Sequence, residues 1–257
     1  MKRRNQTDLG GTLETFLTTH WSLIENIQRD EDPDRALVGL LLQRYWKPVY
    51  CYLRRKGCDN EQAKDLTQDF FYDVVLSRQL IQRADPSKGR FRSFLLHAVK
   101  QYVIDARRRE NAQKHIPKEK LVPLDINDPP ILPQTISNWS PEDCFIYAWK
   151  SAILEETLAE VQSDCLSQGL ETHWHVFQDR ILQPALQNDE PPSMGQICTR
   201  YGIVSETTAS NMIVTVKRRF RTAMRKHLRS TVLSDEEADE ELLDMLKTWD
   251  FSAQDGC

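Results

Sequence analysis

The sequence predicts an all-α protein with two helical domains joined by an extended proline-rich linker. Apolar residues recur at spacings of three and four over several long stretches, which is the period of a helix that buries one face. The chain has only 9 glycines in 257 residues, which favours helices over a sandwich or barrel. Half of its 12 prolines fall within residues 116–141. A helix cannot continue through that density, so residues 116–140 are expected to form the linker.

Three helices are predicted in the first third of the chain. Apolar spacing indicates an amphipathic helix over residues 12–29, inside an N-terminal extension of residues 1–33. A second helix is expected over residues 34–55. A third is expected over residues 60–77, because Asp59 has a glutamine three residues later, as a capping box requires.

A loop and a fourth helix complete the first domain, which is expected to span residues 34–115. Asp-Pro and Lys-Gly pairs within residues 83–90 are typical of turns. The helix that follows is expected over residues 91–114. Its aromatic and aliphatic residues would form a buried face, leaving the basic side chains, Arg92 among them, mostly in solvent.

The second domain is expected over residues 141–232. A serine, a proline and two acidic residues mark the start of a helix that continues to about residue 165, and another helix is expected over residues 172–187. Residues 233–257 form an acidic tail with a short apolar stripe. The tail is either a docking helix or solvated, and we favour the solvated tail.

Residues 193–226 carry a helix-turn-helix pattern. A capping box starts a short helix over residues 194–201, Gly202 ends it, and Ser205 caps a second helix whose apolar residues fall on one face. Basic residues crowd the second helix at positions 217–221. This combination indicates a contact with nucleic acid.

Charge is distributed in blocks that the net charge of −4 conceals. Residues 34–115 hold 17 Lys and Arg against 9 Asp and Glu, and residues 193–232 hold 8 against 1. Between and after these blocks the balance reverses, to 2 against 10 over residues 141–192 and 1 against 9 over residues 233–257. Two basic blocks on one chain suggest two contacts with a polyanion.

Composition also argues against several classes of protein. No run of roughly 18 apolar residues and no signal peptide is found, so we expect a cytoplasmic protein without membrane insertion. The 6 cysteines form no Cys-x-x-Cys pair and are expected to be reduced packing thiols. The spacing of Cys165 from His173 and His175 is poor for a metal site. No phosphate-binding glycine loop or nucleophile–base pair is found, so we expect neither an enzyme nor a cofactor.

Two separated segments resemble sigma factors of the sigma-70 family of RNA polymerase, of the extracytoplasmic-function (ECF) type. Asp-Leu-Thr-Gln-Asp-Phe-Phe at 65–71 resembles the signature of sigma region 2.2. Residues 89–95, followed by 105–109, are similar to regions 2.3–2.4, and residues 193–228 are similar to region 4.2. Short segments such as Thr-Thr-His-Trp-Ser at 18–22 and Ala-Ser-Asn at 209–211 resemble those of the sigma factor branch common in planctomycetes.

The resemblance implies a protein that binds core RNA polymerase and promoter DNA and directs transcription initiation. It also implies an anti-sigma inhibitor as a partner, and no small-molecule substrate. The first domain would dock on the polymerase through one helix face and would help to melt the −10 element by extruding a base. The second domain would place its last helix in the major groove of the −35 element.

Site residues follow from the resemblance and from the expected exposure of each side chain. The expected polymerase-binding residues are Asp65, Gln68, Asp69 and Asp73. The expected −10 DNA-binding residues are Asp85, Ser87, Lys88, Gly89, Arg90, Arg92, Ser93, His97, Lys100, Gln101 and Arg108. The expected −35 DNA-binding residues are Arg200, Thr207, Thr208, Ser210, Asn211, Thr215, Lys217, Arg218, Arg219 and Arg221.

Three other functions remain open. The main alternative is a helix-turn-helix transcription regulator that acts without docking on core polymerase. A helical nuclease would need clustered inward carboxylates, and a pure interaction protein would use its acidic blocks to bind a partner. Within the sigma factor hypothesis, the acidic tail is also a candidate self-inhibitor that covers residues 217–229.

Overall fold

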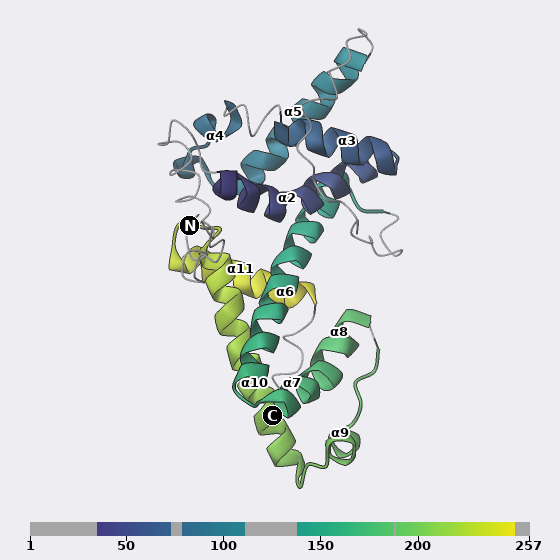
Figure 1. Ribbon diagram of the computed structural model, residues 1–257, viewed down its shortest axis with the longest axis vertical. Helices are drawn as coiled ribbons and strands as arrows, with labels where there is room; N and C mark the ends of the chain where they lie inside the picture. Colours follow the sequence, from purple (N-terminus) through teal and green to yellow (C-terminus); the bar gives the residue numbers. More distant parts are fainter. Residues whose placement is uncertain (1–34, 73–78, 111–137, 188, 250–257) are drawn as a thin grey trace, which may run out of the picture.

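The computed structural model describes residues 35–72, 79–110, 138–187 and 189–249, and Figure 1 shows their arrangement. Every regular element within these ranges is helical, which confirms the predicted all-α class. None of the helices in the described part of the chain combines the length and the hydrophobicity that a bilayer crossing requires.

The first group of helices forms the upper part of the molecule in Figure 1. It consists of α2 (Arg35–Arg55), α3 (Asn60–Phe70), α4 (Gln79–Arg83), the 3₁₀ turn η3 (Pro86–Lys88) and α5 (Phe91–Glu110). The second and fourth predicted helices are confirmed as α2 and α5, as far as α5 is described. The sequence missed α4 and η3, which are too short to show a period.

The third predicted helix is longer than the observed one. α3 ends at Phe70, and Phe71 and Tyr72 continue in a π-type turn. Residues 73–78 lie outside the described ranges. The predicted helix at 12–29 and most of the predicted linker also lie outside them.

The second half of the chain starts with α6 (Pro141–Ser167), the longest helix described. The single helix predicted over 172–187 is divided into α7 (Glu171–Phe177), a π-helical segment η5 (Gln178–Leu182) and α8 (Gln183–Gln187). The wider π-helical turns change the hydrogen-bond register within an otherwise continuous rod.

The two helices predicted for residues 193–226 are observed as α9 (Met194–Tyr201) and α10 (Glu206–Arg229). α10 continues three residues beyond the predicted end. Gly202 ends α9 with φ of 64°, a left-handed conformation that glycine adopts without steric cost. Ser205 caps α10, since its hydroxyl accepts a hydrogen bond from the backbone N–H of Thr208 at 3.2 Å.

Capping boxes explain why the helix starts were readable from the sequence. In each, a side chain accepts a hydrogen bond from the backbone three residues later, and that later residue returns one. The pairs are Asp59 with Gln62 before α3, Ser140 with Asp143 before α6, and Ser193 with Gln196 before α9.

α6 connects the two groups of helices. It packs against α2 near its start and against α10 further along, and Figure 1 shows it running between them. The aromatic core residue Trp149 and the thiols of Cys51 and Cys144 are buried there. Desolvation raises the pKa of the Cys51 thiol to about 12. α6 therefore contacts both groups, whereas the sequence assigned it to the second domain.

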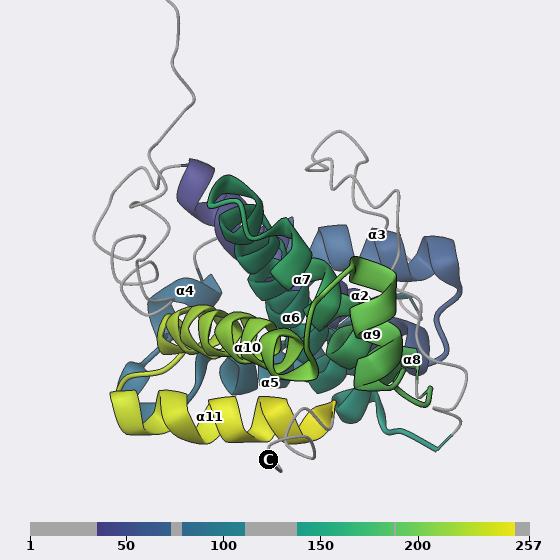
Figure 2. The same ribbon diagram turned by 90° about the horizontal axis from the view of Figure 1, so that it is seen from below.

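The preference for a solvated acidic tail is wrong. Residues Asp235–Thr248 form a helix, α11, that packs beside α10, as Figure 2 shows. Met245 and Leu246 are buried, while Leu243 remains exposed. The apolar stripe of the tail therefore serves as a docking face, and the buried face also includes the carboxylate of Glu241.

Candidate nucleic-acid and polymerase interfaces

α3 presents a polar face to solvent at the upper end of the molecule. Asp65 is exposed, and Gln68 and Asp69 are half-buried beside it, at the spacings of three and four that bring helix side chains together. The fourth predicted member of this face, Asp73, lies outside the described ranges. The opposite face of α3 is buried through Ala63, Thr67 and Phe70.

The loop before α5 is organised by Asp85. Its Oδ1 accepts hydrogen bonds from the backbone N–H of Ser87 at 2.9 Å and from the Ser87 hydroxyl at 2.7 Å. These two hydrogen bonds hold the pKa of Asp85 below its usual value. Lys88 lies 3.4 Å from the same carboxylate, and Gly89 has φ of 114°. The turn therefore exposes Ser87, Lys88 and Gly89, three of the expected −10 contacts.

The side chain of Arg90 is 34% exposed, whereas Arg92 is buried, so the expected exposure of Arg92 is wrong. Both guanidinium groups pair with the carboxylate of Glu241 on α11, with Arg92 Nη2 2.6 Å from Glu241 Oε1. Arg92 is 8% exposed and also lies over the ring of Trp149. The local pattern around Arg92 contains no acidic partner, so it predicted an exposed cation. The partner, Glu241, lies 149 positions further along the chain.

The outer face of α5 carries three exposed polar residues one turn apart. Ser93, His97 and Gln101 follow one another at spacings of four. Phe91 is buried and belongs to the core. Arg108 lies in α5, but its side chain is outside the described part of the structure.

Basic residues of the first group are paired with acidic residues of α6. Lys100, one of the predicted −10 contacts, lies 2.8 Å from Glu142 and is half-buried. Similar pairs join Arg44 with Glu156 at 3.4 Å and Lys47 with Glu155 at 2.8 Å. The acidic block of the sequence thus neutralises part of the first basic block.

The N-terminal half of α10 forms a second exposed polar surface, at the lower end of the molecule in Figure 1. Thr215 is half-buried, and its hydroxyl donates to the carbonyl of Asn211 at 2.8 Å. The other predicted readers are exposed, namely Thr207, Thr208, Ser210 and Asn211.

Val214 lies on the same exposed face and was missed by the sequence reasoning. Its side chain is 62% exposed, and it follows Asn211 by three positions and Thr207 by seven. The apolar residues of this helix were all expected to lie on its core face. The signal available was that Val214 falls outside the buried stripe of Ala209, Ile213 and Val216.

The basic side chains of α10 differ in exposure and in their partners. Arg218 and Arg221 are exposed, and Lys217 is half-buried. Arg219 donates to Gln168 Oε1 at 2.6 Å. The last turns of α10 are held by acids: Arg225 by Asp239, Lys226 and His227 by Glu160, and Arg229 by Asp235.

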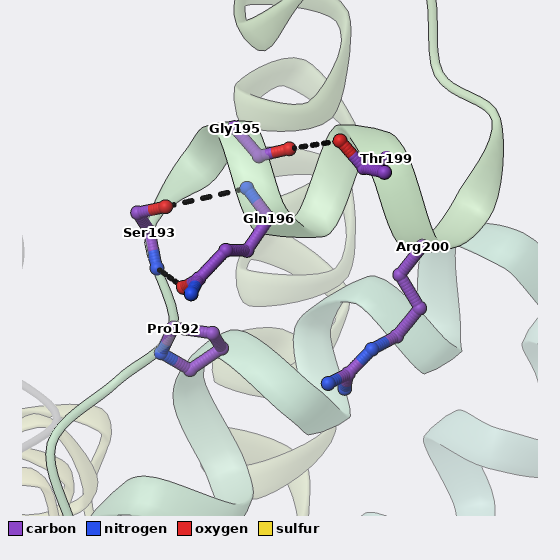
Figure 3. Close-up of a pocket in the computed structure, with 6 residues that line it drawn as sticks. All are labelled: Pro192, Ser193, Gly195, Gln196, Thr199 and Arg200. Carbon is purple, nitrogen blue, oxygen red and sulfur yellow. Dashed lines mark hydrogen bonds between the residues drawn. The ribbon is translucent and has the colours of Figure 1, made fainter.

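The predicted backbone contact Arg200 lies on the outer side of α9. Its guanidinium pairs with Asp179 of η5 at 2.5 Å, and Asp179 also accepts a hydrogen bond from the hydroxyl of Tyr201 at 2.7 Å. Arg200 also lines an open pocket along α9, and Figure 3 shows the lining residues, namely Pro192, Ser193, Gly195, Gln196, Thr199 and Arg200. The hydrogen bonds of Ser193 and Gln196 close the first turn of the helix there.

Comparison with known proteins gives one family match. Searches of curated proteins and of solved structures returned no significant match. Residues 41–113 match the family model of sigma-70 region 2, a segment that includes α3, the loop of Asp85 and α5 as described. The match covers under a third of the chain and supports its assignment to the sigma-70 family of RNA polymerase sigma factors.

Proposed function

We propose that this protein is an alternative sigma factor of the ECF type, which binds core RNA polymerase and directs initiation at promoters with −35 and −10 elements. The observation that carries the proposal is the region 2 match, which contains both the polar face of α3 and the loop before α5. The exposed face of α10 adds a second DNA-binding surface at the other end of the molecule.

The polar face of α3 suits docking on a basic surface of core polymerase. Asp65, Gln68 and Asp69 offer carboxylate and amide oxygens on one side of a helix whose other side is fixed in the core. A rigid helix holds these groups in position before binding, which lowers the entropy cost of association. Asp73 remains an expected polymerase contact of the same segment.

The loop and outer face of α5 suit a melted −10 element. Base extrusion costs a few kcal/mol, which contacts with the unpaired strand must offset. Lys88 is available for phosphate, and Gly89 permits close approach of the backbone. Ser93, His97 and Gln101 form a continuous polar track for bases, with Arg90, Arg92, Lys100 and Arg108 as further expected contacts.

The start of α10 suits the major groove of the −35 element. Asn211 has the donor and acceptor that pair with adenine, and the Val214 side chain suits the methyl group of thymine. Arg218 and Arg221 lie further along the helix, where phosphate contacts are expected. Thr207, Thr208, Ser210 and Thr215 complete the expected reading surface.

Regulation by an anti-sigma protein and residence in the cytoplasm are parts of the same proposal. Both rest on the resemblance to the ECF type, as does the planctomycete-like branch. An inhibitor of this kind would bind against one or both groups of helices and block the surfaces described above. No catalytic chemistry is required of this chain, because the polymerase forms the phosphodiester bonds.

Binding to core polymerase separates this proposal from a helix-turn-helix regulator that acts alone. Purified chain and bacterial core polymerase should co-elute in size-exclusion chromatography. Asp65→Ala should weaken the complex by roughly tenfold, since it removes one charge-assisted contact. Asp164→Asn, which changes an exposed acid on α6, is the matched control and should bind as the wild type does. A wild-type chain that binds duplex DNA but not core polymerase would favour the regulator.

A further inference from the structure

α11 lies outside the family match and reaches back to the residues expected to hold −10 DNA. Its Glu241 is 1% exposed and is the acceptor for both Arg90 and Arg92. Arg92 is fixed from its other side by the ring of Trp149, whose centroid lies 4.2 Å from the guanidinium carbon. One carboxylate therefore forms ion pairs with two arginines of the candidate DNA surface.

The Glu241 cluster is incompletely satisfied. Among the described residues, Glu241 Oε2 and Arg92 Nη1 are buried and have no hydrogen-bond partner. A buried ion pair gives little net stability unless further hydrogen bonds satisfy its remaining atoms. Two guanidinium groups at one carboxylate also leave an excess of positive charge. That arrangement suits a carboxylate that another anion can replace.

Two further ion pairs hold α11. Asp239 pairs with Arg225 of α10 at 2.5 Å, and Asp244 pairs with Lys150 of α6 at 2.7 Å. The Asp239–Arg225 pair is exposed, so it is weak and screened by salt, whereas Lys150 is buried. α11 is thus held by one buried cluster, a short apolar face and these ion pairs, and a polyanion can compete directly for the cations of the cluster and of the exposed pair.

We propose that α11 is an intramolecular competitor of promoter DNA, in which Glu241 takes the place of phosphate at Arg90 and Arg92. The proposal rests on the proposed function, because it takes both arginines as −10 contacts. In the closed state the carboxylate neutralises them, and DNA must displace α11 to reach them. The apparent affinity for DNA then equals the intrinsic affinity multiplied by the fraction of molecules in which α11 has left the two arginines. The surface affected is the −10 surface, since Arg218 and Arg221 on the −35 side remain exposed.

A matched pair of neighbouring substitutions tests the competition in the full chain. Glu241→Gln removes the buried charge, and Glu240→Gln removes an exposed charge from the preceding position of the same helix. The probe is a fluorescein-labelled single-stranded oligonucleotide of mixed sequence, since phosphate contacts do not depend on sequence. Glu241→Gln should bind on the order of tenfold more tightly than wild type, and Glu240→Gln should bind as wild type.

Hydrogen exchange of the unmodified chain gives a second readout that does not depend on how a variant folds. Backbone amides of α11 should lose protection by roughly tenfold when the oligonucleotide binds, while those of α9 should not. The double variant Asp239→Asn/Asp244→Asn loosens α11 from its exposed side and should also tighten binding. If thermal unfolding shows that Glu241→Gln is not folded, the oligonucleotide affinity of the double variant tests the competition instead.

The outcomes separate the two proposals. Wild-type binding with no gain in Glu241→Gln or the double variant, and with α11 still protected in the complex, would overturn the competition and leave the −10 contact in place. Absence of binding by every folded variant would overturn the −10 contact itself, and the competition with it. Tighter binding by Glu241→Gln with loss of protection in α11 supports both.

Discussion

The guanidinium of Arg92 lies over the indole ring of Trp149, 4.2 Å from its centroid. The contact joins the first helix group to α6, and Trp149 is only 2% exposed. Cation–π contacts of this kind add to the hydrophobic burial of the ring. The two halves of the chain therefore share a core at this point, although the sequence pattern divides them into two domains.

Loss of the Trp149 ring should strongly destabilise the fold. Trp149→Ala is expected to lower the free energy of unfolding by about 3–5 kcal/mol, the usual cost of removing a buried aromatic side chain. Trp139→Ala, at a half-buried ring that packs on Tyr147, should cost clearly less. Urea unfolding followed by circular dichroism measures both. Equal losses in the two variants would show that the Trp149 contact does not anchor the core.

Two glycines of the helix-turn-helix should respond to alanine with opposite signs. Gly202 has φ of 64° and nothing within 4 Å of an added Cβ, so Gly202→Ala should cost about 1–2 kcal/mol from backbone strain alone. Gly195 is helical, and its Cβ would meet only ordinary contacts, so Gly195→Ala should stabilise the protein by about 0.5–1 kcal/mol. Thermal unfolding checks the pair. A stabilising Gly202→Ala would contradict the observed turn.

The stability contributed by Glu160 should depend on pH. Burial raises the pKa of Glu160, but hydrogen bonds from Lys226 and His227 outweigh burial and lower it. A lowered pKa in the folded state stabilises the protein above the unfolded value and loses that effect as pH falls through the folded value. Glu160→Gln should therefore cost about 1 kcal/mol at neutral pH, and this cost should disappear as the pH falls through the folded pKa of Glu160, which lies below the ordinary carboxyl value. A difference that does not change with pH would contradict this.

Two arginines of α10 should contribute unequally to DNA binding. Arg218 is exposed, whereas Arg225 is held by Asp239. Arg218→Ala should reduce the slope of log affinity against log salt by about 0.9, the value for one phosphate contact on duplex DNA. Arg225→Ala is the control and should change the slope less. Fluorescence anisotropy with a labelled duplex over a salt series measures both, and identical slopes would exclude Arg218 as a phosphate contact.

Local signals in the sequence predicted the helix-turn-helix and most helix starts. Ser193 with Gln196, Gly202 and Ser205 each act on backbone groups within a few residues, so their effect is readable without the fold. Exposure of Ser93, His97 and Asn211 also follows from helical period alone. These predictions needed no knowledge of distant contacts.

Contacts between distant segments were not predictable in the same way. The sequence pattern predicts a solvated Arg92 because its partners, Glu241 and Trp149, are far from it in the sequence. The tail is predicted to be solvated because its acidic residues outnumber its apolar ones, yet it forms α11, which packs beside α10 with Met245 and Leu246 buried. Arg92 and the apolar residues of the tail both meet partners that are distant in the sequence, and a local pattern gives no signal for such contacts.

Transcription by bacterial core polymerase from a genomic promoter library tests the sigma factor proposal most directly. The purified chain should direct discrete start sites that are lost with Asp65→Ala and with Arg218→Ala and retained with Asp164→Asn. Mapping of the starts would also reveal both promoter elements. If the folded chain directs no starts but still binds duplex DNA, the proposal is contradicted and the chain acts as a DNA-binding regulator without the polymerase.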